Sequence, residues 1–245
     1  MFNINSLNED EKFALLFGIL AGDGCLSLVR GKLKFISIAG GLDDLPFFEE
    51  IVSPLLKYFR GKATNIKFRK DCNAIEFNFS DVNLFNLFVL RDFPVGKKGL
   101  KLVIPKFFYE KDLLKHVIAG FFATDGSLVL TKNLNKYYPR IEGNGISKGL
   151  ILQISNHLNE VGLSGKFYRA KRINDSRDFK VLQDQYRFQF NGKKNSIAFR
   201  EKIGFVNLKH EEKFLNFLRY SEEYDLNIKG ISNSKHYLIR NKVRL

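Results

Sequence analysis

Leu16-Phe17-Gly18-Ile19-Leu20-Ala21-Gly22-Asp23-Gly24 and Ile118-Ala119-Gly120-Phe121-Phe122-Ala123-Thr124-Asp125-Gly126 are two versions of one pattern, an apolar run that ends in Asp-Gly. Each run carries small residues four positions apart, which share one face of a helix and allow two helices to approach closely. The small residues are Gly18/Gly22 and Gly120/Thr124. If the two helices pack through these faces, Asp23 and Asp125 lie side by side. Two carboxylates at one point favour a metal site.

The composition is that of a folded, basic protein. Of its 245 residues, 44% are hydrophobic and 27% are charged, which is enough apolar sequence to bury a core in one or two domains. The 40 Lys and Arg outnumber the 26 Asp and Glu, so the formal net charge is +14. Such an excess is typical of proteins that bind nucleic acid, and the alternative is a basic protein without a polyanionic partner.

Cysteine usage and hydropathy predict a compartment. Cys25 and Cys72 form no CxxC pair, so we expect neither a zinc site nor a disulfide. The first ten residues lack the pattern of a secretory signal, and no apolar run approaches the roughly 20 residues of a membrane span. We therefore expect a soluble intracellular protein, in an archaeal cytoplasm or an organelle. Four histidines without ligand spacing are expected to be structural or surface residues: His116, His157, His210 and His236.

The repeat extends beyond the two runs, because each half is predicted to have the order α-β-β-α-β-β-α. Ser6 and Glu9 have the spacing of a capping box that opens the first helix. In the first half we expect helices up to about Gly22 and at 43–58 and 82–90, with strands at 25–30, 32–39, 62–69 and 74–79. In the second half we expect helices at 111–124, 147–161 and 194–203, with strands at 127–133, 138–143, 166–173 and 185–190.

This pattern divides the chain into two lobes. We place the N-terminal lobe at 1–90, a Pro- and Gly-containing linker at 91–110 and the C-terminal lobe at 111–226, which includes an extra helix at 211–224. The basic tail 227–245 is expected to be partly disordered, or alternatively to form a further DNA-contacting arm. Each lobe has one helix face that needs a partner, so a pseudo-twofold monomer satisfies both.

At this point the chain resembles the LAGLIDADG homing endonucleases of the single-chain, two-motif type. Both nine-residue runs match the family motif, whose penultimate residue is the metal-binding acid, here Asp23 and Asp125. The sixth position, often acidic in the family, is alanine in both copies, but it is not the usual metal ligand. The resemblance implies an α/β (α+β) fold of two αββαββα lobes, with antiparallel sheets that form a DNA-binding saddle and motif helices packed at the lobe interface.

The paired aspartates are the central candidates for catalysis and metal binding. Divalent metals that bridge carboxylates and a scissile phosphate can activate water and neutralise the charge of phosphodiester hydrolysis. Hard oxygen ligands suit Mg²⁺, and we expect Mn²⁺ to substitute and Ca²⁺ to occupy the site without supporting cleavage. In the family the residue before the acid adds its carbonyl, which points to Gly22 and Thr124. The alternative for a single Asp-Gly is a turn that ends a helix.

Lysines near the motifs are the next catalytic candidates. Related proteins carry a lysine shortly before an Ile-Pro in the linker, which matches Lys101, with Lys98 as the alternative. In the second half Lys209 is the best candidate, and the competing residues are Lys202 and Lys213. The family often has a polar side chain at the end of the second strand of each half. Asn144 fits this position in the second half, whereas Gly40-Gly41 leaves it without an equivalent in the first.

Basic and polar residues along the expected strands are the candidates for DNA contacts, because a two-stranded ribbon fits the major groove. The alternative for any one of them is an ordinary solvated strand face. The DNA-binding candidates are Arg30, Lys32, Lys34, Lys62, Lys67, Arg69, Lys132, Arg140, Lys166, Arg169, Lys171, Arg187 and Gln189.

The sequence thus predicts a monomeric homing endonuclease that makes a staggered double-strand break in a long, asymmetric DNA site without a protein partner. Two alternatives are an RNA maturase that assists intron splicing and a non-catalytic DNA-binding regulator on the same scaffold. Retention of both acids argues against the regulator. The initiator Met1 and the lack of flanking splicing residues favour an intron-encoded or free-standing gene. The target sequence is not legible from the chain.

Overall fold

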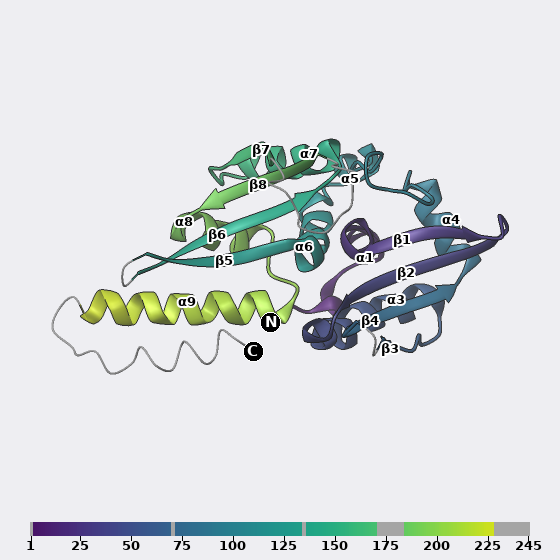
Figure 1. Cartoon of the computed structure of the whole chain (residues 1–245), viewed down its shortest axis with the longest axis horizontal. Helices are drawn as coiled ribbons and strands as arrows, with labels where there is room; N and C mark the ends of the chain where they lie inside the picture. Colours follow the sequence, from purple (N-terminus) through teal and green to yellow (C-terminus); the bar gives the residue numbers. More distant parts are fainter. Residues whose placement is uncertain (1, 70–71, 134–135, 171–183, 228–245) are drawn as a thin grey trace.

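Two four-stranded antiparallel sheets with the same internal order form the framework of the protein (Figure 1). The computed structural model describes residues 2–69, 72–133, 136–170 and 184–227. The first sheet has the order β1 (Gly24–Val29), β2 (Leu33–Gly41), β4 (Ala74–Ser80) and β3 (Lys67–Arg69). The second has the order β5 (Gly126–Asn133), β6 (Lys136–Gly145), β8 (Gln185–Asn191) and β7 (Lys166–Ala170). The predicted α+β fold with two repeated lobes is confirmed.

The two motif helices lie against each other between the sheets, where Figure 1 shows them nearly end-on. They are α1 (Glu9–Asp23) and α6 (Leu114–Asp125), and each runs directly into the first strand of its sheet. A β-carbon on Gly18 would lie against the carbonyl oxygen of Val117, and one on Gly120 against that of Leu15. The small-residue faces therefore bring the two backbones into direct contact, as predicted.

The cap of α1 differs from the expected one. Ile4–Ser6 forms a short 3₁₀ turn, and the Ser6 hydroxyl donates to the Asn3 carbonyl at 2.7 Å. The N-cap is Asn8, whose side chain accepts from the backbone of Glu11 at 2.9 Å while the Glu11 carboxylate accepts from the backbone of Asn8. The predicted capping box of Ser6 and Glu9 was thus wrong by two residues, because the preceding turn uses the Ser6 side chain.

The expected helix at 43–58 is divided into several pieces. A 3₁₀ turn (Leu42–Asp44) leads into α2 (Leu45–Phe47), a π-helical segment (Phe48–Val52) and α3 (Ser53–Arg60), which ends at Gly61 with a positive φ of 67°. Pro54 explains the interruption, because it has no N–H to donate and its ring conflicts with the carbonyl four residues earlier.

The remaining five helices are α4 (Val82–Leu90), α5 (Lys106–Glu110), α7 (Lys148–Glu160), α8 (Lys193–Lys202) and α9 (Leu208–Asn227). Four of them, α4, α7, α8 and α9, pack against the sheets, and α5 packs against the motif helices. The predicted helix at 111–124 begins later, at Leu114, and the last helix is longer than the predicted 211–224. The predicted strand at 62–69 is limited to β3, and positions 171–173 and the tail from 228 onward lie outside the described residues.

Phenylalanine rings join the linker to the motif helix. The Phe17 ring of α1 lies 4.7 Å from Phe108 and 5.1 Å from Phe93, measured between ring centroids. Phe93 and Phe108 belong to the stretch predicted to be a linker, and both are buried. Aromatic pairs at these separations add to the free energy of burial. The linker therefore contributes to the core of the protein.

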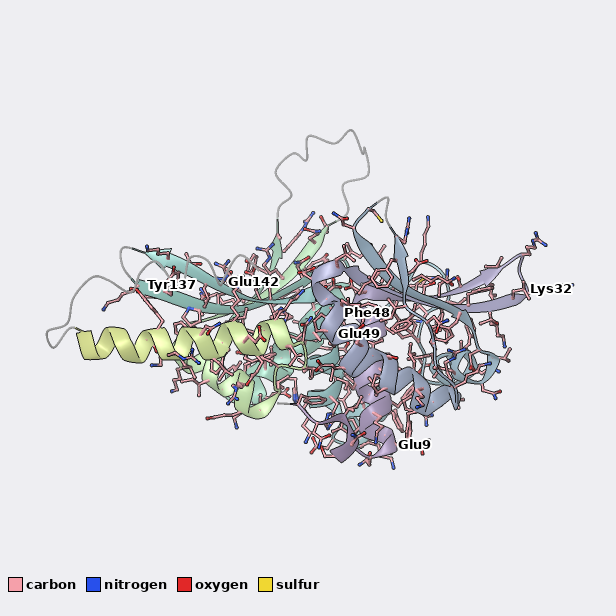
Figure 2. All side chains as sticks on the ribbon, turned by 90° about the horizontal axis from the view of Figure 1, so that it is seen from below. Glu9, Lys32, Phe48, Glu49, Tyr137 and Glu142 are labelled. Atoms are coloured by element: carbon pink, nitrogen blue, oxygen red, sulfur yellow. The ribbon has the colours of Figure 1, made fainter. Side chains whose placement is uncertain are left out.

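The other face of each sheet turns away from the helices, and we call it the open face. In β2 the buried Ile36 and Ile38 point toward the helices, whereas Ser37 and Ala39 alternate to the open face. Figure 2 shows the strands along the upper side of the molecule, with Glu9 at the start of α1 far below them. Within the described residues, no helix is long and apolar enough to cross a membrane.

Candidate metal and nucleic-acid site

The C-terminal ends of α1 and α6 place two carboxylates together, between the two sheets. A β-carbon on Gly22 would lie against the Thr124 side chain, so the chains are in contact one residue before Asp23 and Asp125. The pKa of Asp23 is raised to about 6, first by loss of hydration and next by the charge of Asp125. Loss of hydration also raises the pKa of Asp125. The repeated motif therefore creates a site of unfavourable negative charge.

The donor atoms at this point fit a hard divalent cation. Two carboxylates and the backbone carbonyls of Gly22 and Thr124 are oxygen ligands of the kind that Mg²⁺ and Ca²⁺ prefer. Both aspartates are exposed on one side, so an ion can reach them. Among the residues that the structure describes, no group of three or more His, Cys, Asp or Glu converges on such a site. The remaining coordination positions would thus be left to water or to a phosphate.

A buried lysine from the linker lies beside the two carboxylates. Lys98 Nζ donates to the carbonyl oxygens of Leu20 at 2.8 Å and Ala21 at 2.9 Å, and also to that of Gly22. These carbonyls end α1, where a positive charge is favourable. Loss of hydration lowers the pKa of Lys98 to about 8, although Asp125 and Asp23 oppose the shift. Lys98 therefore has both the position and the environment of a functional group.

Lys101, the preferred linker candidate, is placed differently. It is exposed, three residues beyond Lys98 in the same turn, and its backbone N–H donates to the Lys98 carbonyl at 3.0 Å. In the described chain it is not among the charges that shift the pKa of either aspartate. The geometry thus favours the alternative, Lys98. The Ile-Pro spacing located the turn but could not tell which lysine faces inward.

The second half brings a lysine to the site through a contact between lobes. Lys209 Nζ pairs with Asp44 and lies 3.7 Å from Asp43 Oδ2 in the first lobe. Asp44 raises the pKa of Asp23, and Lys209 lowers it, so both charges act on the carboxylate pair. The two competing lysines are not brought there: Lys202 is exposed in the last turn of α8, and Lys213 is not among the charges on Asp23.

Asn207 links Asp44, Lys209 and the end of α6 through hydrogen bonds. Its side-chain nitrogen donates to Asp44 Oδ1 and to the Ala123 carbonyl, both at 2.9 Å, and its oxygen accepts from the backbone of Lys209 at 3.2 Å. Ala123 and Ala21 hold the same position in their motifs, so Asn207 serves the end of α6 as Lys98 serves the end of α1. Sequence reasoning missed Asn207 and Asp44. The only signal was the acidic pair that follows Gly40-Gly41.

The strand register sorts the DNA-binding candidates by face. Lys67 and Arg69 lie opposite open-face residues of β4, and Arg140, Lys166, Arg187 and Gln189 lie on the open face of the second sheet. Arg30 and Lys32 occupy the turn between β1 and β2, and Figure 2 shows Lys32 at the far tip of this ribbon. Asn144 is exposed on β6, opposite Arg187.

Three other candidates lie on the helix-covered face, because successive side chains of a strand point to opposite faces of the sheet. Lys34 donates to Asn86 of α4 and lies over the Phe85 ring. Lys132 pairs in register with Tyr137, and Arg169 pairs with Tyr186. Both tyrosines alternate with open-face residues, so the two basic side chains lie on the helix-covered face. Arg169 also forms an ion pair with Asp184. Lys62 is exposed just beyond α3, and Lys171 lies outside the described residues.

The histidines take no part in this site within the described chain. His116 Nε2 lies 3.2 Å from Glu11 Oε1, where α6 and α1 begin. His157 lies near Glu160 on α7, and burial lowers the pKa of His210 to about 3. These placements agree with the structural roles expected from the sequence. His236 lies outside the described residues.

Comparisons with known proteins find a matching family model and solved structures of similar fold. Residues 112–204 match the family model of the LAGLIDADG-like domain. The I-LtrWI LAGLIDADG homing endonuclease, solved bound to target DNA, has a TM-score of 0.57 at 13% identity over 91% of this chain and 92% of that chain. The LAGLIDADG meganuclease I-AabMI, bound to uncleaved DNA, has a TM-score of 0.56 at 13% identity, with coverages of 87% and 91%. No curated protein sequence matches the chain.

A third similar structure contains metal. I-DmoI in complex with DNA and Ca has a TM-score of 0.53 at 16% identity over 80% of this chain and 91% of that chain. I-DmoI has also been solved with DNA and Mn. The structural likeness spans both lobes, whereas the match to the family model lies in the second.

Proposed function

We propose that this chain, which contains a LAGLIDADG-like domain and has the two-lobed fold of the LAGLIDADG homing endonucleases, is a metal-dependent endonuclease that cuts both strands of DNA. The observation that carries the proposal is the meeting of Asp23 and Asp125 at the ends of two packed helices, between two sheets. The solved complexes of similar proteins with DNA, and of one with DNA and Ca or Mn, support it. Mg²⁺ is the proposed physiological ion.

The substrate would lie along the open faces of both sheets. The net charge of +14 favours a polyanion and makes binding dependent on salt. Because the two lobes differ in sequence, a single chain suits a long site without twofold symmetry. Each strand would be cut close to one aspartate, which leaves staggered ends. We infer a monomer, encoded in an intron or as a free-standing gene.

The chain's own groups can perform the chemistry around the phosphate. A divalent ion held by Asp23, Asp125 and the carbonyls of Gly22 and Thr124 would neutralise the phosphate charge and activate water. The Lys98 ammonium, already aimed at the end of α1, can move toward a phosphate oxygen and stabilise its developing charge. Lys209 would play the equivalent part for the second strand, with Asp44 holding its Nζ.

A selection experiment tests the function directly. The full chain would be incubated with a library of randomised DNA duplexes and Mg²⁺, and cut molecules would be captured and sequenced. We expect one long, non-palindromic consensus, cut at staggered positions on the two strands, with no cutting in EDTA. Selective binding of RNA or DNA without any cleavage would instead favour the maturase or the regulator and would refute the nuclease.

Lys98→Met is expected to lower the cleavage rate about 100-fold, in the range seen when one charge-stabilising donor is lost. The matched control is Lys101→Met, the same change three residues away on an exposed side chain, which should leave the rate within about threefold. The rates would be measured by single-turnover cleavage of the selected duplex. Because Lys98 also contacts the end of α1, the melting temperature and the Kd for DNA in Ca²⁺ must be compared. A larger loss with Lys101→Met would restore Lys101 as the functional lysine.

A further inference from the structure

The first two strands of each lobe can be compared position by position. In the first sheet Gly24 pairs with Ile38, and in the second Gly126 pairs with Gly143, so the residues after the two Asp-Gly motifs correspond. Along β2 and β6, Leu33 then corresponds to Tyr138, Phe35 to Arg140, Ser37 to Glu142 and Ala39 to Asn144. All of these side chains lie on open faces, so they would meet DNA in equivalent places.

The antiparallel pair of β1 and β2, which we call the β1–β2 ribbon, has an open face without a charged or amide side chain. Its side chains are Cys25, Ser27 and Val29 on β1 and Leu33, Phe35, Ser37 and Ala39 on β2. Val29 is 43% exposed and Leu33, its partner in register, is 54% exposed. These exposed apolar side chains are available to an apolar group of the partner, such as a base methyl in the major groove. Of the basic residues of this ribbon, Arg30 and Lys32 lie in its turn and Lys34 lies on the helix-covered face.

The β5–β6 ribbon of the second lobe presents hydrogen-bonding groups instead. The outer strands β3 and β4 of the first lobe also carry such groups, Lys67, Arg69 and Asn78, so the two lobes differ in their first ribbons. Arg140 Nε lies 2.8 Å from Glu142 Oε2 on the same face of β6. Across the sheet, the Tyr168 hydroxyl donates to Gln189 Oε1 at 2.9 Å, and Gln189 Nε2 donates to Asn191 Oδ1 at 2.9 Å. These contacts hold the long side chains in fixed orientations, which lowers the entropy lost when they bind. Arginine and glutamine are the residues that read guanine and adenine in the major groove.

We propose that the β1–β2 ribbon of the first lobe reads its base pairs through different chemistry from the β5–β6 ribbon of the second. The β5–β6 ribbon recognises purine edges through hydrogen bonds from Arg140, beside Arg187 and Gln189 of β8. The β1–β2 ribbon recognises the C5-methyl groups of thymine through Val29, Leu33 and Phe35, while Arg30 and Lys32 contact the backbone phosphates. The proposal rests on the proposed function, because it assumes that both open faces contact one duplex.

The two kinds of contact differ in how strongly they discriminate. A bidentate hydrogen-bonded pair that meets the wrong base loses roughly 10-fold to 100-fold in affinity. A thymine methyl that loses an apolar contact costs at most about fourfold. The base pairs under the β1–β2 ribbon are therefore rich in A·T and tolerant of substitution, whereas those under the β5–β6 ribbon are specified more strictly.

Base analogues separate the two chemistries. Deoxyuridine replaces thymine without the methyl group, and 7-deazapurines remove the N7 acceptor that arginine and glutamine contact. Each analogue would be placed in the segment of the selected duplex under one ribbon, and the Kd of the full chain would be measured in Ca²⁺, so that no strand is cut. Deoxyuridine is expected to weaken binding about 10-fold when it fills the segment under the β1–β2 ribbon and less than about twofold under the β5–β6 ribbon. The 7-deazapurines should weaken binding about 10-fold or more under the β5–β6 ribbon and not under the β1–β2 ribbon.

Matched variants then assign each penalty to a ribbon. Replacement of Val29, Leu33 and Phe35 together by alanine should abolish the deoxyuridine penalty, and Leu33→Ala alone should reduce it, whereas Tyr138→Ala, at the position that corresponds to Leu33, should leave it unchanged. Arg140→Ala should reduce the 7-deazapurine penalty, whereas Phe35→Ala should not. Equal penalties under both ribbons, or a deoxyuridine penalty that survives the triple variant, would overturn the inference while leaving the nuclease intact. If no duplex is bound or cut, the proposed function fails, and this inference fails with it.

Discussion

Asp23→Asn or Asp125→Asn is expected to lower double-strand cleavage by more than about 1,000-fold, because each removes a charged ligand from the point where the motif helices bring two acids together. DNA affinity should change by only a few fold, since most contacts lie on the open faces. Cleavage of the selected duplex in Mg²⁺ and binding in Ca²⁺ would measure the two effects.

Asp10→Asn provides the matched control for these two variants. Asp10 is exposed in the first turn of α1, at the opposite end of the helix that carries Asp23. It carries the same charge on the same helix, so the control removes one acid without altering the carboxylate pair. Its cleavage rate should stay close to that of the unaltered protein. Cleavage within about tenfold of normal after Asp23→Asn or Asp125→Asn would contradict the assigned chemistry.

The same two substitutions should stabilise the metal-free protein at neutral pH. The folded state raises the pKa of Asp23 from its ordinary value of 3.8 to about 6, so it binds protons more readily than the unfolded chain. Stability therefore falls as the pH rises from about 4 to 6, and the loss is complete above that range. Melting temperatures should be higher for the variants at pH 7 and nearly equal at pH 4. Added Ca²⁺ should raise the melting temperature of the unaltered protein at pH 7.

The sequence predicted the fold well where the signal is local or repeated. The two motifs placed α1, α6 and their terminal acids, and alternation in the 74–79 segment placed β4. Prediction failed where distant residues decide the outcome. Lys34 lies in a strand of the expected kind, but its partner Asn86 is 52 positions away and lies on the helix-covered side. Alternation with Ile36 and Ile38 indicates the side on which Lys34 lies, but no local pattern reveals the partner that it meets there.

The candidate site shows the same difference between residues with a repeated sequence signal and residues placed by long-range contacts. Asp23 and Asp125 could be found because one pattern occurs twice, whereas Lys98 is distinguished from Lys101 only by how the turn folds back on α1. Asn207 and Asp44 lie 163 positions apart and meet only because the lobes are packed together. Long-range polar contacts of this kind have no sequence period. They explain why the acids of the site were predictable and the groups around them were not.

Gly120→Ala is expected to destabilise the protein by about 3 kcal/mol or more, which is opposite in sign to the usual effect of this substitution in a helix. An added β-carbon would lie against the Leu15 carbonyl oxygen, 2.9 Å from the Ile19 nitrogen and 3.1 Å from the Gly18 α-carbon. All three are backbone atoms of α1, which no change of rotamer can move. The two helices would have to separate.

Separation of the helices would also move the two acids apart, so Gly120→Ala should lose cleavage even at temperatures where it remains folded. Gly18→Ala tests the same contact from the other side, because its β-carbon would lie against the Val117 carbonyl and 2.8 Å from the Phe121 nitrogen. Asn156→Ala, at an exposed position of α7, is the control for an alanine in a helix. Denaturant unfolding and single-turnover cleavage would be measured for all three. A Gly120→Ala protein that is more stable than the unaltered one would show that the helices do not meet through these glycines, and the shared metal site would lose its structural basis.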